Sequence, residues 1–282
     1  MKKFKQFNIV FEPFVPDLVS GELWELNITG IDERESELVV YSDESSMLTK
    51  EMFERILNKI ISENLIISFN VTETEIENKN WNEEWEKKIQ VIEVTDKIVI
   101  KPSFKEYNAK KGQIIITIDP KMSFGTGEHQ TTQLMLQLIE KYIVKGDKVL
   151  DVGTGTGILA IASIKLGAAR ALAIDNDEWC FNNANENVKI NLVEDKIRIQ
   201  LAEIHEIQEK NFDLILANIN KNVLLSIADD VYSKIKKTGR LILSGLLLND
   251  EKEVINKYTS VGFQLAEKKY KDEWLAIVFT SA

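Results

Sequence analysis

The spacing of apolar and polar residues separates a short N-terminal part of the chain from a longer C-terminal part. In the N-terminal part the pattern predicts extended strands at residues 4–11, 35–42 and 65–74. It predicts helices at 16–26 and 49–63, where apolar residues return every three or four positions. The apolar face of the second helix comprises Met52, Phe53, Ile56, Leu57, Ile60 and Ile61.

We interpret residues 1–76 as a small α+β domain with the βαββαβ order of a split ferredoxin-like sandwich. Gly30 leaves the boundary between its second and third elements open. The polar segment 77–90 is interpreted as a linker, in which Trp81 and Trp85 share one side of a short helix. These two indoles either pack the linker against a neighbouring domain or contact a substrate.

The C-terminal part, residues 91–282, opens with three predicted strands, around 91–94, 97–101 and 113–118. An amphipathic helix follows, marked by Leu134, Met135, Leu138, Ile139 and Tyr142. From Lys148 onward strands and helices alternate, and the segments read KVLDVG, GILAIASIKLG, ALAID, EWCFNNANENVKI, IRIQLA, FDLILANI, NVLLSIADDVYSKI and RLILSGLL. This alternation predicts an α/β domain whose parallel sheet is covered on both faces.

The end of the chain breaks this alternation. A helix is predicted over 250–258, and the closely spaced segments FQLAEKKY and EWLAIVFT then predict an antiparallel hairpin at the sheet edge.

The amino-acid composition and net charge of the chain restrict the classes of protein and partner to be considered. The chain has 282 residues, 44% hydrophobic and 28% charged, which is typical of a globular protein of about two domains. The net charge of -10 argues against nucleic acid as the main partner, because phosphates bind clustered basic surfaces. That charge suits a basic protein substrate, or it merely keeps the protein soluble.

One cysteine, Cys180, and two histidines, His129 and His205, exclude an internal disulfide, a cysteine-rich zinc site and a multi-histidine metal centre. The N-terminus lacks the apolar core of a signal peptide, and no run approaches the roughly 18 apolar residues of a membrane span. We therefore expect a cytoplasmic protein without a metal or a membrane partner.

The segment most indicative of chemistry is VLDVGTGTGILAIA, in which an apolar strand runs into three alternate glycines and then a helix. Glycine lets the backbone turn sharply and lie against a ligand. Gly153, Gly155 and Gly157 form GxGxG, whereas dinucleotide folds usually show GxGxxG. The preceding Asp151 would repel a diphosphate and suits the cationic methionine end of S-adenosylmethionine. The alternative is a tight connection without a ligand.

Asp175 ends the next predicted strand, where a carboxylate can accept two hydrogen bonds from ribose hydroxyls. Its other possible role is a helix N-cap, for which Asp177 is better placed. No GxxxxGK[ST] sequence is present, so nucleoside triphosphate hydrolysis lacks its phosphate loop.

Asn218 ends the strand LILAN at the carboxyl edge of the predicted sheet, where its amide can orient an amine or simply terminate the strand. Enzymes that methylate nucleobases or glutamine amides usually carry a proline-rich, aromatic-tipped tetrapeptide here. This chain reads NINK from Asn218 to Lys221, which disfavours those substrates.

Upstream, the loop 123–132 combines glycines and hydroxyls that let it close over a ligand or begin a helix. His129 in this loop is either a structural cap or a base.

These residues closely resemble the PrmA family, bacterial methyltransferases that modify the eleventh protein of the large ribosomal subunit. The resemblance runs through DPKMSFGTGEHQTT, VLDVGTGTGILAIA, AIDND, LILANI, LILSGLL and DEWLAI, nearly all of residues 80–282. It implies a class I Rossmann-like, seven-stranded methyltransferase domain joined by a mobile linker to an N-terminal substrate-recognition domain. Its methyl-donor contacts fall on Thr132, Gly153, Asp175 and Asn218, and our interpretation of the glycine motif adds Asp151 and Gly155.

The chain departs from the family in two places. Members often read Asn-Ile-Leu-Ala where this chain has NINK, which alters the mouth of the substrate site. The N-terminal unit resembles the family only in length and rough pattern.

The resemblance implies an S-adenosylmethionine-dependent protein methyltransferase that acts on lysine ε-amines and the N-terminal α-amine of that ribosomal protein. We expect the protein to be a monomer. We expect Asn218, Phe124 and Thr126 to shape the amine site. The open alternatives are a methyltransferase for another protein or a small amine, a non-catalytic ribosome-associated binding module, and a nicotinamide dehydrogenase.

Overall fold

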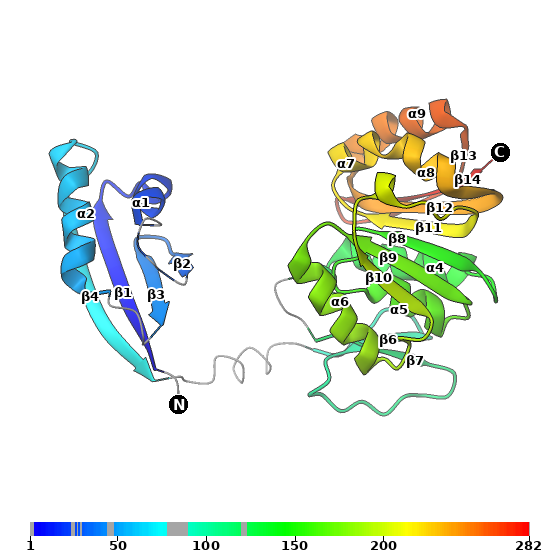
Figure 1. Ribbon diagram of the computed structural model, residues 1–282, viewed down its shortest axis with the longest axis horizontal. Coiled ribbons are helices and arrows are strands. Elements are labelled where there is room, and N and C mark those ends of the chain that lie inside the picture. Colours follow the sequence, from blue (N-terminus) through cyan, green and yellow to red (C-terminus); the bar gives the residue numbers. More distant parts are fainter. Residues whose placement is uncertain are drawn as a thin grey trace. The chain divides into compact units, whose positions relative to one another are not determined.

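A computed structural model describes residues 3–23, 26, 28, 30–43, 48–77, 90–119 and 123–281 of the chain. Contacts divide the chain into two compact units, Met1–Lys88 and Ile89–Ala282 (Figure 1). Within the described residues, no helix combines the length and the apolar character needed to cross a membrane. Most of the predicted linker, including Trp81 and Trp85, lies outside the described residues.

The N-terminal unit has the predicted βαββαβ order. Its elements are β1 (Lys3–Glu12), α1 (Pro16–Leu23), β2 (Gly30–Glu33), β3 (Leu38–Asp43), α2 (Lys50–Ser62) and β4 (Ser68–Glu77). The strands pair antiparallel in the order β2-β3-β1-β4, as expected for a ferredoxin-like sheet. The described part of helix α1 runs to Leu23, and the next two residues of the predicted helix lie outside the described residues.

Alternation along β1 explains the packing of this unit. Phe7, Ile9 and Phe11 lie on one face of the sheet, since successive side chains of a strand point to opposite faces. The apolar face of α2 covers them, and the rings of Phe7 and Phe53 lie 4.4 Å apart. The predicted face of α2 is confirmed, with Phe53 and Leu57 among its fully buried members.

The C-terminal unit begins with a separate three-stranded sheet in the order β5-β6-β7, formed by β5 (Ile92–Glu93), β6 (Ile98–Lys101) and β7 (Ile114–Thr117). Isoleucines of β6 and β7 pack into the same core as α4 (Gln130–Tyr142) and α5 (Ile158–Lys165).

The main sheet has seven strands in the order β10-β9-β8-β11-β12-β14-β13. The strands are β8 (Lys148–Val152), β9 (Arg170–Asp175), β10 (Ile197–Leu201), β11 (Phe212–Asn218), β12 (Ile235–Leu247), β13 (Phe263–Lys271) and β14 (Trp274–Ser281). Five strands are parallel, and β14 lies antiparallel between β12 and β13. The predicted hairpin is present, although only β13 is at the edge.

Two apolar cores lie on the two faces of this sheet, because residues alternate along each strand. One contains side chains of α4, α5 and α6 (Glu178–Ile190), and the other contains those of α7 (Lys221–Ser226), α8 (Ala228–Lys234) and α9 (Glu251–Val261). The two groups of helices lie on opposite sides of the sheet (Figure 1). The segment predicted as one helix after β11 is two, because the α-helix stops at Ile227 and restarts. Two short 3-10 turns, Ile204–Glu206 and Leu248–Asp250, complete the unit.

Candidate active site

A cavity of about 680 Å³ opens at the carboxyl ends of β8, β9 and β11, where open parallel sheets bind their ligands. Five residues predicted as site residues line it together: Phe124, Gly153, Gly155, Asp175 and Asn218. The fold brings these residues together although they are far apart in sequence.

The glycine-rich turn forms the floor of the cavity. Gly153 and Gly155 have φ of 70° and 56°, a left-handed conformation that disfavours other residues. A Cβ at Gly155 would lie 2.3 Å from the backbone oxygen of Phe124, and one at Gly153 would lie 2.3 Å from Cγ2 of Ile219. Gly155 therefore lets the turn lie under the loop that carries Phe124, and Gly153 lets it lie against Ile219.

Asp175 is fixed at the end of β9 by backbone hydrogen bonds. The Gly155 amide donates to one carboxylate oxygen at 2.9 Å, and the Asp177 amide donates to the other at 3.1 Å. Asp177 caps α6, since its side chain accepts from the Trp179 amide at 2.7 Å. The prediction that Asp177 caps the helix is confirmed. Asp175 instead contacts the glycine turn and lines the cavity.

The charge of the cavity lining is negative. Asp175 and Glu203 line it, and no lysine or arginine is found among the described lining residues. Carboxylates without opposing cations favour a positively charged ligand and disfavour a polyphosphate.

Asn218 is the last residue of β11, and its side-chain oxygen is buried without a hydrogen-bond partner in the described part of the chain. A buried acceptor of this kind favours binding of an N–H or O–H donor. The following Asn220 caps α7 by accepting from the Val223 amide at 3.2 Å. Lys221 instead pairs with Asp250 and Glu253, so this departure from the family pattern brings no lysine into the cavity.

The loop before α4 is tied to the glycine turn through Thr156. Its amide donates to the Phe124 oxygen at 3.0 Å, and its hydroxyl donates to the Gly125 oxygen at 2.7 Å. Asn187 of α6 holds the Thr156 carbonyl in turn, with a 2.9 Å bond from its side-chain amide.

Asn187 belongs to a row of three asparagines that the sequence analysis missed. Asn183, Asn187 and Asn191 recur every four residues on one side of α6, and all three are buried. Asn191 exchanges two hydrogen bonds with the backbone of Thr117, and Asn187 accepts from the Asp119 amide. The signal that could have revealed them is one residue type, asparagine, repeated every four positions along one side of a helix.

Three aromatic rings form one wall of the cavity. The His129 ring lies edge-on between Phe124 and Trp274, with centroid distances of 5.3 and 4.7 Å. His129 is also the N-cap of α4, where Nδ1 accepts from the Thr131 amide at 3.3 Å. Trp274 was missed as a site residue, although it lies in the DEWLAI segment.

Three other predicted site residues do not line the cavity: Thr126, Thr132 and Asp151. The Thr132 hydroxyl is buried without a partner in the described residues. Asp151 is fully buried, on the face of β8 that packs toward α4 and α5, and accepts from the Thr154 hydroxyl at 2.6 Å. Burial raises the pKa of Asp151 to about 7.

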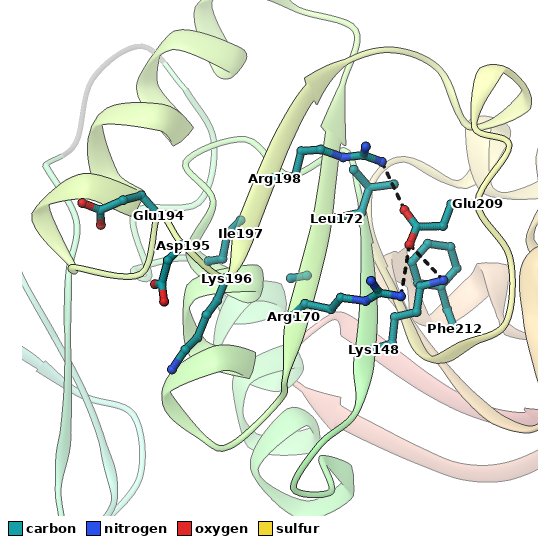
Figure 2. A pocket seen from close by; sticks show the side chains of 11 residues that line it. Lys148, Arg170, Leu172, Glu194, Asp195, Lys196, Ile197, Arg198, Glu209 and Phe212 are labelled. Atoms are coloured by element: carbon teal, nitrogen blue, oxygen red, sulfur yellow. Dashed lines mark hydrogen bonds and ion pairs between the residues drawn. The ribbon is translucent and has the colours of Figure 1, made fainter.

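A second cavity, of about 350 Å³, lies at the opposite ends of the same strands (Figure 2). Glu209 there pairs with Lys148 at 3.0 Å, Arg198 at 3.1 Å and Arg170 at 3.5 Å. Both arginines are 63% exposed, so these pairs contribute little individually to stability. None of the predicted site residues lines this cavity, which we interpret as a surface ion-pair cluster.

Comparison with known proteins gives concordant matches. A family model described as ribosomal protein L11 methyltransferase (PrmA) matches residues 21–282. The ribosomal protein L11 methyltransferase of Chlorobaculum tepidum is 40% identical over 92% of each chain. That of Exiguobacterium sp. is 37% identical over 75% of this chain and 68% of its own length. The solved structure of a ribosomal protein L11 methylase from Lactobacillus delbrueckii subsp. bulgaricus is 34% identical, has a TM-score of 0.65, and covers 68% of this chain and 99% of its own.

Proposed function

The chain belongs to the PrmA family of ribosomal protein L11 methyltransferases, and we propose that it methylates amino groups of ribosomal protein L11. It is an S-adenosylmethionine-dependent protein methyltransferase with the class I fold. The acceptors in the proposal are lysine ε-amines and the N-terminal α-amine.

The observation that carries the proposal is the charge and position of the larger cavity. It opens beside a GxGxG turn, carries Asp175 and Glu203, and has no described lysine or arginine in its lining. S-adenosylmethionine supplies a methyl group on a cationic sulfur, and the positive sulfonium suits a negative lining. A nicotinamide dinucleotide would instead bring a diphosphate close to the Asp175 carboxylate, which supports a methyl donor over that alternative.

The residues present fit such a donor. The Asp175 carboxylate is held in place by two backbone amides and has free lone pairs for two ribose hydroxyls. Gly153 and Gly155 allow the backbone to approach the donor without side chains. Two predicted donor residues lie outside the cavity lining: Thr132 has a buried hydroxyl that lacks a partner in the described structure, and Asp151 supports the turn by accepting from the Thr154 hydroxyl.

In the proposed mechanism, Asn218 accepts an N–H of the acceptor amine and thereby orients its lone pair toward the methyl group. Presenting a lysine amine as the free base at pH 7 costs about 4 to 5 kcal/mol from its usual pKa near 10.4. Desolvation beside Phe124 lowers that cost, because an apolar wall destabilises the charged form. Thr126 acts through the loop backbone, since its side chain does not line the cavity. Positioning and desolvation then supply most of the rate.

We assign substrate recognition to the N-terminal unit, residues 1–76, and the connection between the units to residues 77–90. Helices α1 and α2 pack on one face of the ferredoxin-like sheet, and no helix among the described residues covers the other face, which we assign to a partner protein.

The test is methyl transfer from labelled S-adenosylmethionine to purified ribosomal protein L11. We expect label in L11 and stoichiometric formation of S-adenosylhomocysteine. Label in a different protein of a cell extract, or in a small amine, would identify another acceptor, and donor binding without turnover would indicate a binding module. Tight binding of NAD without affinity for S-adenosylmethionine would contradict the proposal altogether.

A further inference from the structure

The Gln133 side chain joins the loop before α4 to the β13–β14 hairpin. Its amide nitrogen donates to the backbone oxygens of Gly127 and Glu128, at 3.1 Å each. Its amide oxygen accepts from the Lys271 ammonium. Both protons and the oxygen of the amide are therefore engaged, and this set of partners fixes the orientation of the side chain.

The pairing of β13 with β14 places the Lys271–Gln133 contact next to the aromatic wall of the cavity. Lys271 lies directly opposite Trp274 in the antiparallel register, so both side chains project from the same face of the hairpin. On that face Trp274 contacts the His129 ring, while Lys271 holds Gln133. The hairpin thus contacts the loop and the start of α4 at two adjacent points.

The other end of the loop is held by Thr156, through the Phe124 and Gly125 oxygens. Phe124 belongs to the first attachment and His129 directly follows the second, and both side chains line the cavity. Loss of either attachment would let the aromatic wall shift relative to the glycine turn.

We propose that Gln133 and Lys271 are positioning residues that hold the aromatic wall formed by Phe124, His129 and Trp274 in place for the acceptor amine. This inference rests on the proposed methyltransferase function and adds two residues to it that touch neither donor nor acceptor. A displacement of about 1 Å at a reacting centre can cost about a hundredfold in rate. The pair therefore affects acceptor use and leaves donor binding unchanged.

The experiment uses the full chain with Gln133→Leu, Lys271→Met, the double variant and Lys271→Arg. We expect each of the first two to lower kcat/KM for L11 by about ten- to a hundredfold, with the Kd for S-adenosylmethionine within about twofold of wild type. The double variant should lose no more than the stronger single variant, because both changes break one connection. Lys271→Arg should recover most of the activity, since a guanidinium can donate to the Gln133 oxygen.

Gln137→Leu, one turn further along α4, is the matched control and should retain wild-type kinetics. Wild-type kcat/KM in both Gln133→Leu and Lys271→Met would overturn the proposal, as would an equal loss in Gln137→Leu. A proportional loss of donor affinity would also overturn it, because the pair would then belong to the donor site.

Hydrogen exchange of the backbone amides of residues 124–129 provides a readout that needs no substrate. Faster exchange in Gln133→Leu than in wild type or Gln137→Leu supports the positioning role, and unchanged exchange refutes it. If the wild-type chain failed to methylate L11, the proposed function would fail, while this measurement would still decide whether Gln133 orders the loop.

Discussion

Replacing Asp175 with asparagine tests the assignment of the donor site most directly. The carboxylate accepts from the Gly155 amide with one oxygen and from the Asp177 amide with the other. An asparagine has a single oxygen, so its NH₂ group must face one of these N–H donors. The variant therefore loses one backbone bond and the negative charge offered to the ribose.

The expected loss follows from the number of bonds involved. A hydrogen bond to a charged group contributes about 1.5 to 3 kcal/mol. Losing about 2 to 3 kcal/mol of donor binding corresponds to a rise in Kd of roughly 30- to 150-fold. We expect titration calorimetry of Asp175→Asn with S-adenosylmethionine to give a value in this range.

Two comparisons separate the causes of this loss. S-adenosylhomocysteine keeps the ribose and lacks the sulfonium charge, so a ribose contact predicts the same factor for both ligands. Asp177→Asn is the matched control, because asparagine caps a helix as well as aspartate does. A Kd within twofold of wild type in Asp175→Asn would refute the assignment, and a loss confined to the sulfonium ligand would move the role of Asp175 from ribose to charge.

Three further predictions concern the cavity and the turn beneath it. Asn218→Ala should lower single-turnover methyl transfer at saturating S-adenosylmethionine by about ten- to a hundredfold, and wild-type turnover would remove Asn218 from the mechanism. Gly155→Ala should destabilise the fold by about 2 kcal/mol or more, because its Cβ would lie 2.3 Å from the Phe124 oxygen at a left-handed φ, and an unchanged urea midpoint would contradict this. Burial raises the pKa of Asp151 to about 7, above its unfolded value near 3.9, so the native state retains a proton that the unfolded state loses and stability falls as pH rises from about 4 to 7. Asp151→Asn should flatten that decline in pH-dependent urea unfolding and stabilise the chain above pH 7 by up to about 4 kcal/mol, whereas a decline as steep as wild type would count against it.

Asp151 also illustrates where the sequence-based interpretation of the site reached its limit. The sequence pattern predicts that the acid before the glycines faces the donor, but in the structure it is buried on the side of β8 that packs toward α4 and α5. Alternation along the strand places Val149 and Asp151 on one face and Leu150 and Val152 on the other. The alternation along a strand therefore determines which of its residues share a face, but the neighbouring elements determine which face meets the cavity.

The sequence by itself determined the order of strands and helices, the glycine turn, and the convergence of Asp175 and Asn218 at one sheet edge. These follow from local periodicity and from the rule that parallel strands present their carboxyl ends together. The tertiary structure alone decided the insertion of β14 between β12 and β13, the contact of His129 with Trp274, and the bond between Gln133 and Lys271 across 138 residues. Hydrophobic periodicity reports which face of an element is buried, whereas partners this distant in sequence are set by sheet order and register, which no local pattern encodes.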